Sequence, residues 1–289
     1  MKLHLLDGTY ELFRSYFGAP PRTSPYGREV GGTYGIMAST LGLLGQADVT
    51  HLAAAFDTVI ESFRNDIYPA YKTSAGIDPK LLDQFPLAED GLRAMGVVVW
   101  SMFEFETDDA LATAAHRWAD QVDQVVVLTP DKDMAQLYGH PNVIGYERRN
   151  QKEVDELQVI EKFGVVPESI PDYLGLVGDS ADGYPGLPGW GAKSAGAILA
   201  RYGHLEDIPL EASRWDVAVR GADKLCATLR SQIGDALLYR FLATLRRDVP
   251  ITETLPDLEW RGVPREPFDA FCERYGFESL ADRVPRWAD

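Results

Sequence analysis

The sequence predicts an α/β fold in which a central, mostly parallel sheet is followed by a helical C-terminal part. Four short apolar runs alternate with helical patterns, and continuous apolar runs of this kind are typical of buried parallel strands. Aspartate ends three of the runs, and beyond Pro167 the patterns are only helical. The four strand-like runs are residues 3–6, 52–56, 97–100 and 125–128.

Composition indicates a globular intracellular protein. The chain has 289 residues, of which 45% are hydrophobic, which is enough to bury a substantial core. Cys226 and Cys272 lie far apart with no zinc or redox spacing, which predicts buried thiols in a reducing cytosol. Asp7 interrupts the N-terminal apolar run too early for a signal peptide, and no run approaches the length of a membrane span. We therefore expect a cytoplasmic protein with no membrane partner.

Acidic residues follow the strand-like runs. Asp7 and Asp57 come directly after the first two, and the run that ends at Leu128 leads to Asp131 and Asp133. Because ligands in open α/β sheets bind beyond the carboxyl ends of the strands, these side chains should converge.

A further acidic group follows the run that ends at Trp100. The residues Glu106-Thr107-Asp108-Asp109 precede a helical pattern, and Thr107 is its expected N-cap. Taken alone, Asp108 and Asp109 are explained equally well as first-turn acids that complement the helix dipole.

A carboxylate pair also opens the loop from Gly178 to Gly191. Asp179 and Asp182 stand at its start, glycine and proline punctuate the remainder, and a helical pattern follows over residues 192–201. Carboxylates bind hard cations. Glycine turns and helix N-termini let backbone N–H groups approach a phosphate closely. The alternative is an ordinary pair of helices joined by a turn with acidic caps.

Taken together, the acidic groups predict a metal site. Carboxylates packed side by side repel one another unless cations offset the charge. The set lacks thiolates and a histidine pair at zinc spacing, so its oxygen ligands indicate magnesium or manganese. Two such ions about 4 Å apart are typical of phosphodiester hydrolysis. The residues thus predict a metal-dependent phosphoryl-transfer enzyme.

Ordered motifs over nearly the whole chain resemble the bacterial and phage 5′ nuclease (flap endonuclease) family, which also forms the N-terminal module of many bacterial DNA polymerase I chains. The motifs are Leu6-Asp7-Gly8, Ala55-Phe56-Asp57, Phe63-Arg64, Tyr71-Lys72, Glu106-Thr107-Asp108-Asp109, Asp131-Lys132-Asp133-Met134-Ala135-Gln136-Leu137, Gly178-Asp179-Ser180-Ala181-Asp182 and Pro185-Gly186-Leu187-Pro188-Gly189-Trp190-Gly191.

The resemblance implies a domain organisation. Residues 1–166 would form a PIN-like 5′ nuclease core, with a helical arch over about residues 66–96. Residues 167–289 would form a helical DNA-binding part, with a helix–three-turn–helix motif over about residues 172–203.

The resemblance also implies roles for the acids, with two or more Mg²⁺ or Mn²⁺ ions as cofactors. Asp57 and Asp109 would be active-site acids that act partly through bound water, and Asp179 and Asp182 would hold a second metal. The residues that would hold or surround the first metal are Asp7, Glu106, Asp108, Asp131 and Asp133.

Basic and loop residues receive roles in the same way. Lys72 and Arg64 match residues that contact the scissile phosphate, and Tyr68 or Tyr71 would either stack on an unpaired base or pack in the core. In the helix–three-turn–helix loop a monovalent cation such as K⁺ would bridge carbonyl groups and a phosphate oxygen. The residues expected to bind DNA there are Gly186, Gly189, Gly191, Lys193 and Ser194.

Three departures from the family pattern stand out. Ala75 occupies the position of a usual arginine, which puts one phosphate contact in doubt. Pro130 replaces a glycine before the metal-binding aspartate, and Gly183-Tyr184 replaces an asparagine–aliphatic pair.

The resulting hypothesis is a 5′-3′ exonuclease or flap endonuclease that acts on DNA near 5′ ends or flaps at duplex junctions. The net charge of −16 argues against a nucleic-acid partner, but bound cations would offset part of it and a local basic field can oppose it. The rival hypotheses are a ribonuclease of related fold, a small-molecule phosphatase and a non-catalytic junction-binding protein. The sequence identifies no polymerase or ligase partner.

Overall fold

The structure is a computed structural model that describes residues 1–288. Contacts divide the chain into two compact units. Unit 1 comprises residues 1–62 and 74–129 and the segment from Arg247 onward, whereas unit 2 comprises residues 63–73 and 130–246. The units are interleaved along the chain and do not follow the predicted division at residue 166. As a division into functional domains, the ranges 1–166 and 167–289 stay a prediction.

Unit 1 is built on four parallel strands in the order β3-β2-β1-β4. Leu5 lies opposite Ala53 on one side and Val127 on the other, and all three side chains are buried. The apolar runs therefore form strands because both faces of the sheet are covered. All four predicted strands are confirmed, with shifted ends. The strands are β1 (Lys2–Asp7), β2 (His51–Asp57), β3 (Val98–Met102) and β4 (Gln124–Leu128).

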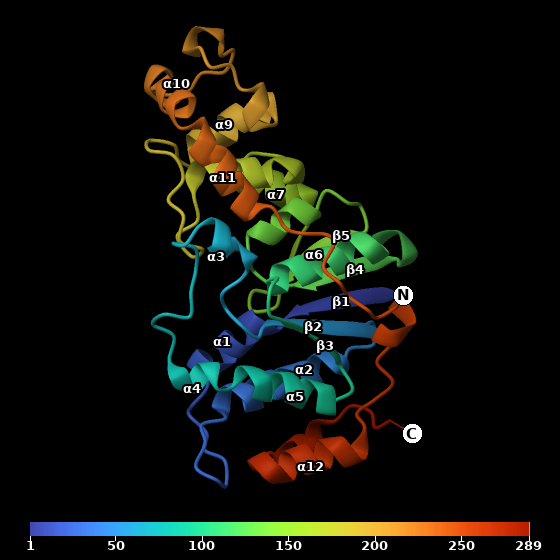
Figure 1. The fold of residues 1–289 in the computed structure, drawn as a ribbon. Helices are drawn as coiled ribbons and strands as arrows, with labels where there is room; N and C mark the ends of the chain where they lie inside the picture. The colour runs from blue at the N-terminus through green and yellow to red at the C-terminus, as the bar shows by residue number, and fades with distance from the viewer. Residues whose placement is uncertain (289) are drawn as a thin grey trace. The chain divides into compact units, whose positions relative to one another are not determined.

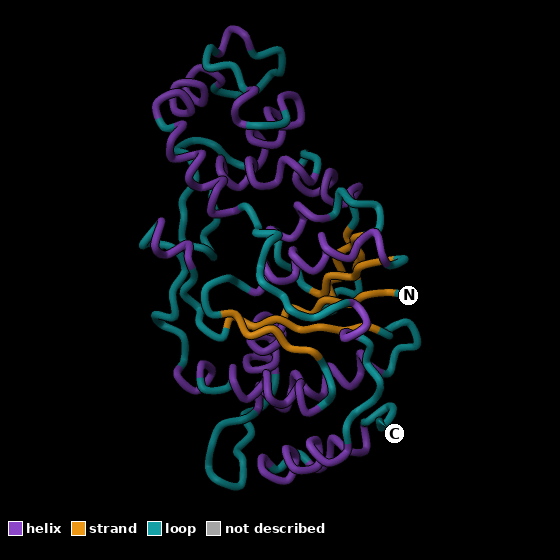
Figure 2. The backbone as a smooth tube through the Cα atoms, turned by 45° about the vertical axis from the view of Figure 1, so that its right-hand side comes forward, coloured by secondary structure: helices purple, strands orange, loops and turns teal. Residues whose placement is uncertain are grey.

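Helices lie on both faces of this sheet (Figure 1). One face is covered by α6, which contacts all four strands; α1 and α5 cover the other face, with α2 packed on both of them and α12 on α5. Figure 2 shows the strands enclosed between these helical layers. The helices of unit 1 are α1 (Gly8–Gly18), α2 (Gly31–Leu44), α4 (Pro79–Leu82), α5 (Phe85–Ala94), α6 (Thr107–Trp118) and α12 (Arg265–Tyr275), with 3-10 helices η1 (Ala119–Gln121), η6 (Leu255–Leu258) and η7 (Glu278–Arg283).

Unit 2 is mainly helical. Helix α8 packs against α11 and α9, and the glycine-rich loop of residues 178–191 joins α8 to α9. Strands β5 and β6 form an antiparallel pair. The elements of unit 2 are α3 (Phe63–Ile67), η2 (Asp133–Leu137), β5 (Val143–Glu147), β6 (Lys152–Val154), α7 (Glu156–Phe163), η3 (Pro167–Ser169), α8 (Ile170–Val177), α9 (Ala192–Tyr202), η4 (Leu205–Asp207), η5 (Ala212–Arg214), α10 (Ala222–Ser231) and α11 (Ile233–Ala243).

The predicted start of α6 was wrong by one residue. Glu106, with φ −102° and ψ 162°, is the N-cap, and its N–H donates to Asp109 Oδ2 at 3.1 Å. Thr107 is already helical, and its own N–H donates to Asp57 Oδ1 at 2.6 Å. The acids of this segment therefore take the capping role that the sequence assigned to the threonine.

Part of the predicted arch belongs to the packed layer of unit 1. Phe85, Ala88 and Leu92 of α5 are buried, and the helix lies against α2 and β3. An arch over the remaining residues of the range 66–96 stays a prediction.

Two further features concern the length of the helices and the burial of the cysteines. None of the described helices is both long and apolar enough to cross a membrane. Cys226 and Cys272 are buried and unpaired, and burial raises the pKa of the Cys272 thiol to about 12. Thiols that stay protonated in this way are unreactive.

A buried aspartate ties together the helices of unit 2. Asp172 of α8 accepts hydrogen bonds from His204 Nδ1 at 2.8 Å, from the N–H of Leu205 at 3.2 Å and from Arg240 Nη1 at 3.0 Å. Arg240 also binds the carboxylate of Glu206. The hydrogen bond to Asp172 raises the pKa of His204 above its ordinary value, although desolvation opposes the rise.

Replacing His204 by glutamine should remove part of the pH dependence of stability. A histidine whose pKa is raised by folding contributes stability that is complete below the unfolded value of 6.5 and is lost as pH rises through the folded value. The free energy of unfolding is measured by urea denaturation below pH 6.5 and again above the folded pKa of His204. As pH rises between these two points, it should fall more for the wild type than for His204→Gln. Equal falls would show that the contact with Asp172 does not form in solution.

Candidate metal and phosphate site

The carboxyl ends of the strands in unit 1 carry two of the predicted acids. Asp7 ends β1 and accepts hydrogen bonds from the N–H of Tyr10 and from Thr129 Oγ1, each at 2.8 Å. Asp57 ends β2 and accepts the N–H of Thr107. Since β1 and β2 are parallel neighbours, both carboxylates lie at one edge of the sheet.

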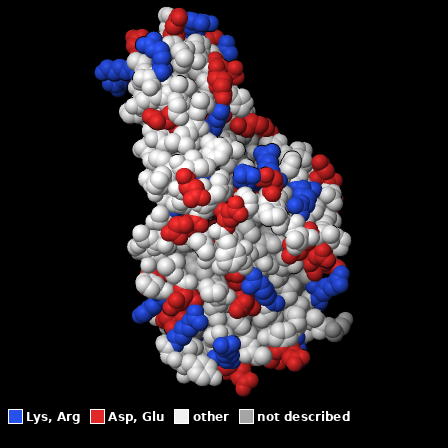
Figure 3. All heavy atoms as spheres, in the orientation of Figure 1, with Lys and Arg blue, Asp and Glu red and all other residues white. Residues whose placement is uncertain are grey.

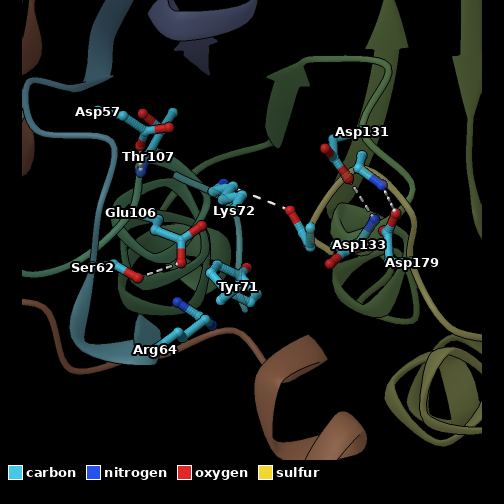
Figure 4. A network of polar contacts seen from close by, with 12 residues as sticks. Asp57, Ser62, Arg64, Tyr71, Lys72, Glu106, Thr107, Asp131, Asp133 and Asp179 are labelled. Atoms are coloured by element: carbon cyan, nitrogen blue, oxygen red, sulfur yellow. Dashed lines mark hydrogen bonds and ion pairs between the residues drawn. The ribbon is translucent and has the colours of Figure 1, made fainter. Parts of the chain in front are cut away.

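The start of α6 brings three more acids to unit 1. Glu106 accepts a hydrogen bond from Ser62 Oγ at 2.7 Å (Figure 4). Asp109 is fully buried at the helix N-terminus. Asp108, in contrast, is half-buried. The hydrogen bond between Thr107 and Asp57 joins this helix start to the end of β2. Unit 1 thus collects Asp7, Asp57, Glu106, Asp108 and Asp109.

Unit 2 holds a second acidic group, which we call the loop cluster: Asp133, Asp179 and Asp182. One carboxylate oxygen from each lies within 4.8 Å of the others. Asp133 begins η2, and its N–H donates to Asp131 Oδ1 at 2.9 Å (Figure 4). The sequence analysis placed Asp133 around the first metal, whereas the structure groups it with the two acids of the loop.

Repulsion dominates the electrostatics of the loop cluster. Burial, followed by the charges of Asp131, Asp182 and Asp179, raises the pKa of Asp133 well above its ordinary value. Lys132 forms an ion pair with Asp179. Burial alone would lower the pKa of Lys132, but the hydrogen bond to Asp179 and the surrounding carboxylates raise it. The lysine is therefore held as a cation beside the cluster.

Lys72 also lies beside the loop cluster. Its Nζ is 3.8 Å from Asp182 Oδ1, and its backbone N–H donates to the carbonyl of Asp182 at 2.9 Å. A Cβ on Gly183 would lie 2.5 Å from the carbonyl oxygen of Ala70, so the glycine allows the two segments to pack closely. The backbone of Lys72 is thus held in place by main-chain contacts.

Arg64 is placed differently from Lys72. Its side chain is buried, with Nε donating to the carbonyl of Leu242 at 2.8 Å and Nη2 to that of Thr244 at 3.1 Å. These bonds satisfy carbonyl groups at the C-terminal end of α11. A phosphate contact by Arg64 stays a prediction.

Two glycines of the loop are needed for the fold. Gly178 and Gly186 have φ of +84° and +70°. A Cβ on Gly178 would lie 2.3 Å from the carbonyl carbon of Pro185, and one on Gly186 would lie 2.3 Å from that of Val177. The two ends of the turn therefore touch through their backbones, and a side chain at either position would separate them.

The later loop glycines have more space. Gly189 has φ +84°, with a Leu225 methyl group as its nearest neighbour, whereas a Cβ on Gly191 would meet nothing within 4 Å. Gly191 is the N-cap of α9, and its N–H donates to Ser194 Oγ at 3.1 Å. Lys193 is exposed. Gly189 and Gly191 thus have more free space around them than Gly178 and Gly186.

Sequence reasoning assigned no role to several residues that contact the acids. Thr129, which binds Asp7, follows β4 directly, so its position at a strand end was a usable signal. Ser62 carries no such signal. Lys132 was expected near the DNA path, but its ion pair with Asp179 of the loop cluster was not predicted.

The residues of the loop cluster fit a divalent cation. All the donors are carboxylate oxygens, as hard cations prefer. Asp133 Oδ1 is buried and has no hydrogen-bond partner among the described residues. A buried carboxylate oxygen without a donor is costly, and a cation would satisfy it.

Comparison with known families agrees with these observations. Residues 2–164 match the model described as "5'-3' exonuclease, N-terminal resolvase-like domain", and residues 165–266 match "5'-3' exonuclease, C-terminal SAM fold". The chain belongs to the 5′-3′ exonuclease family. The α/β fold with a helical C-terminal part, expected from the sequence, is that of the family.

Curated relatives of this family member are bacterial DNA polymerases I. The chain is 31% identical over 287 residues to that of Bacillus caldotenax, covering 98% of this chain and 32% of the relative. It is 34% identical over 301 residues to that of Rhizobium leguminosarum, covering 99% and 28%. The chain therefore spans about a third of the length of these relatives.

Solved structures share the fold. A bacteriophage T5 protein co-crystallised with metal ions gives a TM-score of 0.70 at 17% identity, with 84% of this chain and 89% of that chain covered. The T5 flap endonuclease in a pseudo-enzyme-product complex with DNA and metal ions gives 0.67 at 19%, with 84% and 89% covered. The catalytic core of Rad2 in complex with DNA substrate gives 0.61 at 16%, with 100% and 92% covered.

Serine substitutions should separate the two kinds of loop glycine. Gly186→Ser places a side chain at φ +70°, which costs about 1–2 kcal/mol before the overlap with Val177 is counted. Gly191→Ser should be nearly neutral, because the site is open and serine is a favoured N-cap. Thermal unfolding of both variants tests this, and equal melting temperatures would contradict it.

Proposed function

We propose that this protein is a metal-dependent 5′-3′ exonuclease or flap endonuclease that hydrolyses DNA near 5′ ends or flaps at duplex junctions. The observation that carries the proposal is the loop cluster of oxygen ligands with Lys72 Nζ at 3.8 Å from Asp182. Structural relatives were crystallised with DNA and with metal ions, which supports the substrate class. No activity that belongs to the rest of the DNA polymerase I relatives is proposed for this chain.

The proposed cofactors are two or more Mg²⁺ or Mn²⁺ ions. In unit 2 the residues that would hold one are Asp133, Asp179 and Asp182, with Asp131 beside them. In unit 1 the acids at the strand ends and the start of α6 are Asp7, Glu106 and Asp108, with Asp57 and Asp109 acting through water. Such an ion, when bound, lowers the pKa of a coordinated water and neutralises developing charge on phosphate oxygens.

The chain's own residues would orient the phosphate. The backbone of Lys72 is hydrogen-bonded to Asp182, so its ammonium group would lie close to an anion bound beside the loop cluster. A fixed cation of this kind stabilises the charge that develops in the transition state. Lys132 would share the neutralisation of the acids, because it already pairs with Asp179. No side-chain nucleophile is required.

The loop and α9 would hold the duplex backbone. The free space beside Gly191 would let a phosphate approach the start of α9, where Lys193 is exposed, and a K⁺ ion bridging loop carbonyls remains part of the proposal. Gly189 and Ser194 lie in the same stretch. A DNA contact at Gly186 stays a prediction, because the close approach of Val177 already explains why this position has no side chain.

The acidic net charge limits how DNA is bound. The charge of −16 means that affinity must rest on local groups. On the face drawn in Figure 3, acidic and basic side chains are interspersed. Backbone amides, bound cations and a few lysines would then carry the contact, and binding would weaken as salt rises.

Removing the charges of Asp179 and Asp182 should separate binding from cleavage. The double Asp→Asn variant keeps side-chain volume but loses charged ligands, so it should bind a labelled 5′-flap junction in Ca²⁺ yet lose most cleavage in Mg²⁺ or Mn²⁺. The matched control replaces the exposed Asp223 and Asp235 of unit 2 by asparagine and should cleave normally.

The same assay distinguishes the rival functions. Cleavage by the wild type in excess chelator would contradict metal dependence. Preference for an RNA flap would favour a ribonuclease, faster hydrolysis of nitrophenyl phosphate a phosphatase, and binding without any cleavage a junction-binding protein.

Lys72→Ala should lower the single-turnover rate about 100-fold while changing affinity for the junction much less. A cation aimed at developing charge acts mainly in the transition state. Lys162→Ala, which removes an exposed lysine from α7, is the control and should leave both quantities unchanged. Equal losses of rate and affinity in Lys72→Ala would make Lys72 a binding contact only.

A further inference from the structure

Tyr184 forms part of the backbone frame of the loop cluster. Its N–H donates to the carbonyl of Asp179 at 3.0 Å, and the N–H of Asp179 donates to the carbonyl of Tyr184 at 2.9 Å. The two residues thus form an isolated antiparallel bridge across the turn. Tyr184 stands where the resemblance to the 5′ nuclease family places an aliphatic residue.

The ring of Tyr184 is held between two other tyrosines. Its centroid lies 6.4 Å from that of Tyr71 at an interplanar angle of 8°, and 5.6 Å from that of Tyr239 at 20°. The backbone bridge and the stacking on both faces leave the ring little freedom to turn. Its hydroxyl is therefore held in one direction.

The hydroxyl of Tyr184 has no hydrogen-bond partner among the described residues, although the side chain is only 1% exposed. The carboxylates whose charges act on this phenol are those of Asp133, Asp182, Asp179 and Asp131. A phenol carries its proton at neutral pH, so it offers a donor in a region of carboxylates. Buried polar groups nearly always find a partner, and an unsatisfied one costs free energy.

A second buried atom without a partner belongs to the loop cluster itself. Asp133 Oδ1 is also buried without a hydrogen-bond partner among the residues described. One of the two atoms is a donor and the other is an oxygen ligand of the kind that divalent cations bind. An oxygen shell around a cation at Asp133, Asp179 and Asp182 would give both atoms a partner at once.

We propose that Tyr184 is a positioning residue of this metal site, whose hydroxyl donates a hydrogen bond to the oxygen shell of the cation held by Asp133, Asp179 and Asp182. The inference rests on the metal site of the proposed function and adds a residue to it. Groups that orient metal ligands in this way typically change metal affinity by 10–100-fold when removed. The competing explanation is that Tyr184 only fills space within the tyrosine stack.

Tyr184→Phe is the decisive variant, because it removes the hydroxyl and keeps the ring. Titration calorimetry of the full chain with Mn²⁺ alone should show affinity for the loop cluster lowered about tenfold. The binding event that belongs to this cluster is identified as the one lost in the Asp179→Asn, Asp182→Asn double variant. Tyr239→Phe removes a hydroxyl from the same stack and should leave Mn²⁺ affinity unchanged.

The fold without metal gives the second measurement. Tyr184→Phe should unfold at the same temperature as the wild type or a higher one, because a buried hydroxyl without a partner is removed. Added Mn²⁺ should then raise the melting temperature of the variant less than that of the wild type.

Two outcomes would overturn the proposal. One is unchanged Mn²⁺ affinity in Tyr184→Phe, and the other is loss of the metal-free fold, which would show that the hydroxyl serves folding. The proposed function fails separately: a wild type that cleaves no DNA, beside a Tyr184→Phe variant with weakened Mn²⁺ binding, would overturn the nuclease proposal and leave the role of Tyr184 standing.

Discussion

Repulsion between carboxylates is the constraint around which the loop of unit 2 is arranged. Asp133, Asp179 and Asp182 bring oxygens within 4.8 Å of one another, and Asp133 is buried. Such a group opposes folding unless protons, donors or cations offset its charge. The chain supplies the Lys132 ammonium to Asp179 and an N–H from Ala181 to the same side chain. The repulsion that is left over favours a divalent cation, since binding one stabilises the folded chain.

Main-chain contacts hold together the loop that carries Asp179 and Asp182. Gly178 and Gly186 touch through their main chains, and the bridge between Asp179 and Tyr184 closes the turn inside that contact. The backbone around Asp179 is therefore held by main-chain contacts of the loop itself. A site organised in this way binds with less ordering cost than one that must fold around its ion. The loop glycines differ in this respect, because close packing does not require a glycine at Gly191, where a Cβ would meet nothing within 4 Å.

Local patterns were sufficient to predict the strands and the acids at their ends. The run that ends at Asp7 is apolar because both faces of the sheet are covered, and the parallel arrangement then places Asp57 at the same edge. Contacts between distant segments could not be predicted in this way. The burial of Arg64 depends on carbonyls of Leu242 and Thr244, and the packing of α12 on α5 joins the end of the chain to its first half. Periodicity holds no information about such pairs.

The two lysines beside the loop cluster relate to cations in different ways. Lys132 pairs directly with Asp179, so an ion that binds the same oxygen has to compete with its ammonium. Lys72 is held through its backbone N–H to Asp182, and its Nζ stands 3.8 Å from that carboxylate. The backbone of Lys72 therefore stays in place whether a proton, the Lys132 ammonium or a metal ion neutralises the acids of the cluster. A cation whose position does not depend on what fills the neighbouring site is suited to orient an anion there, because no reorganisation is needed when the charge changes.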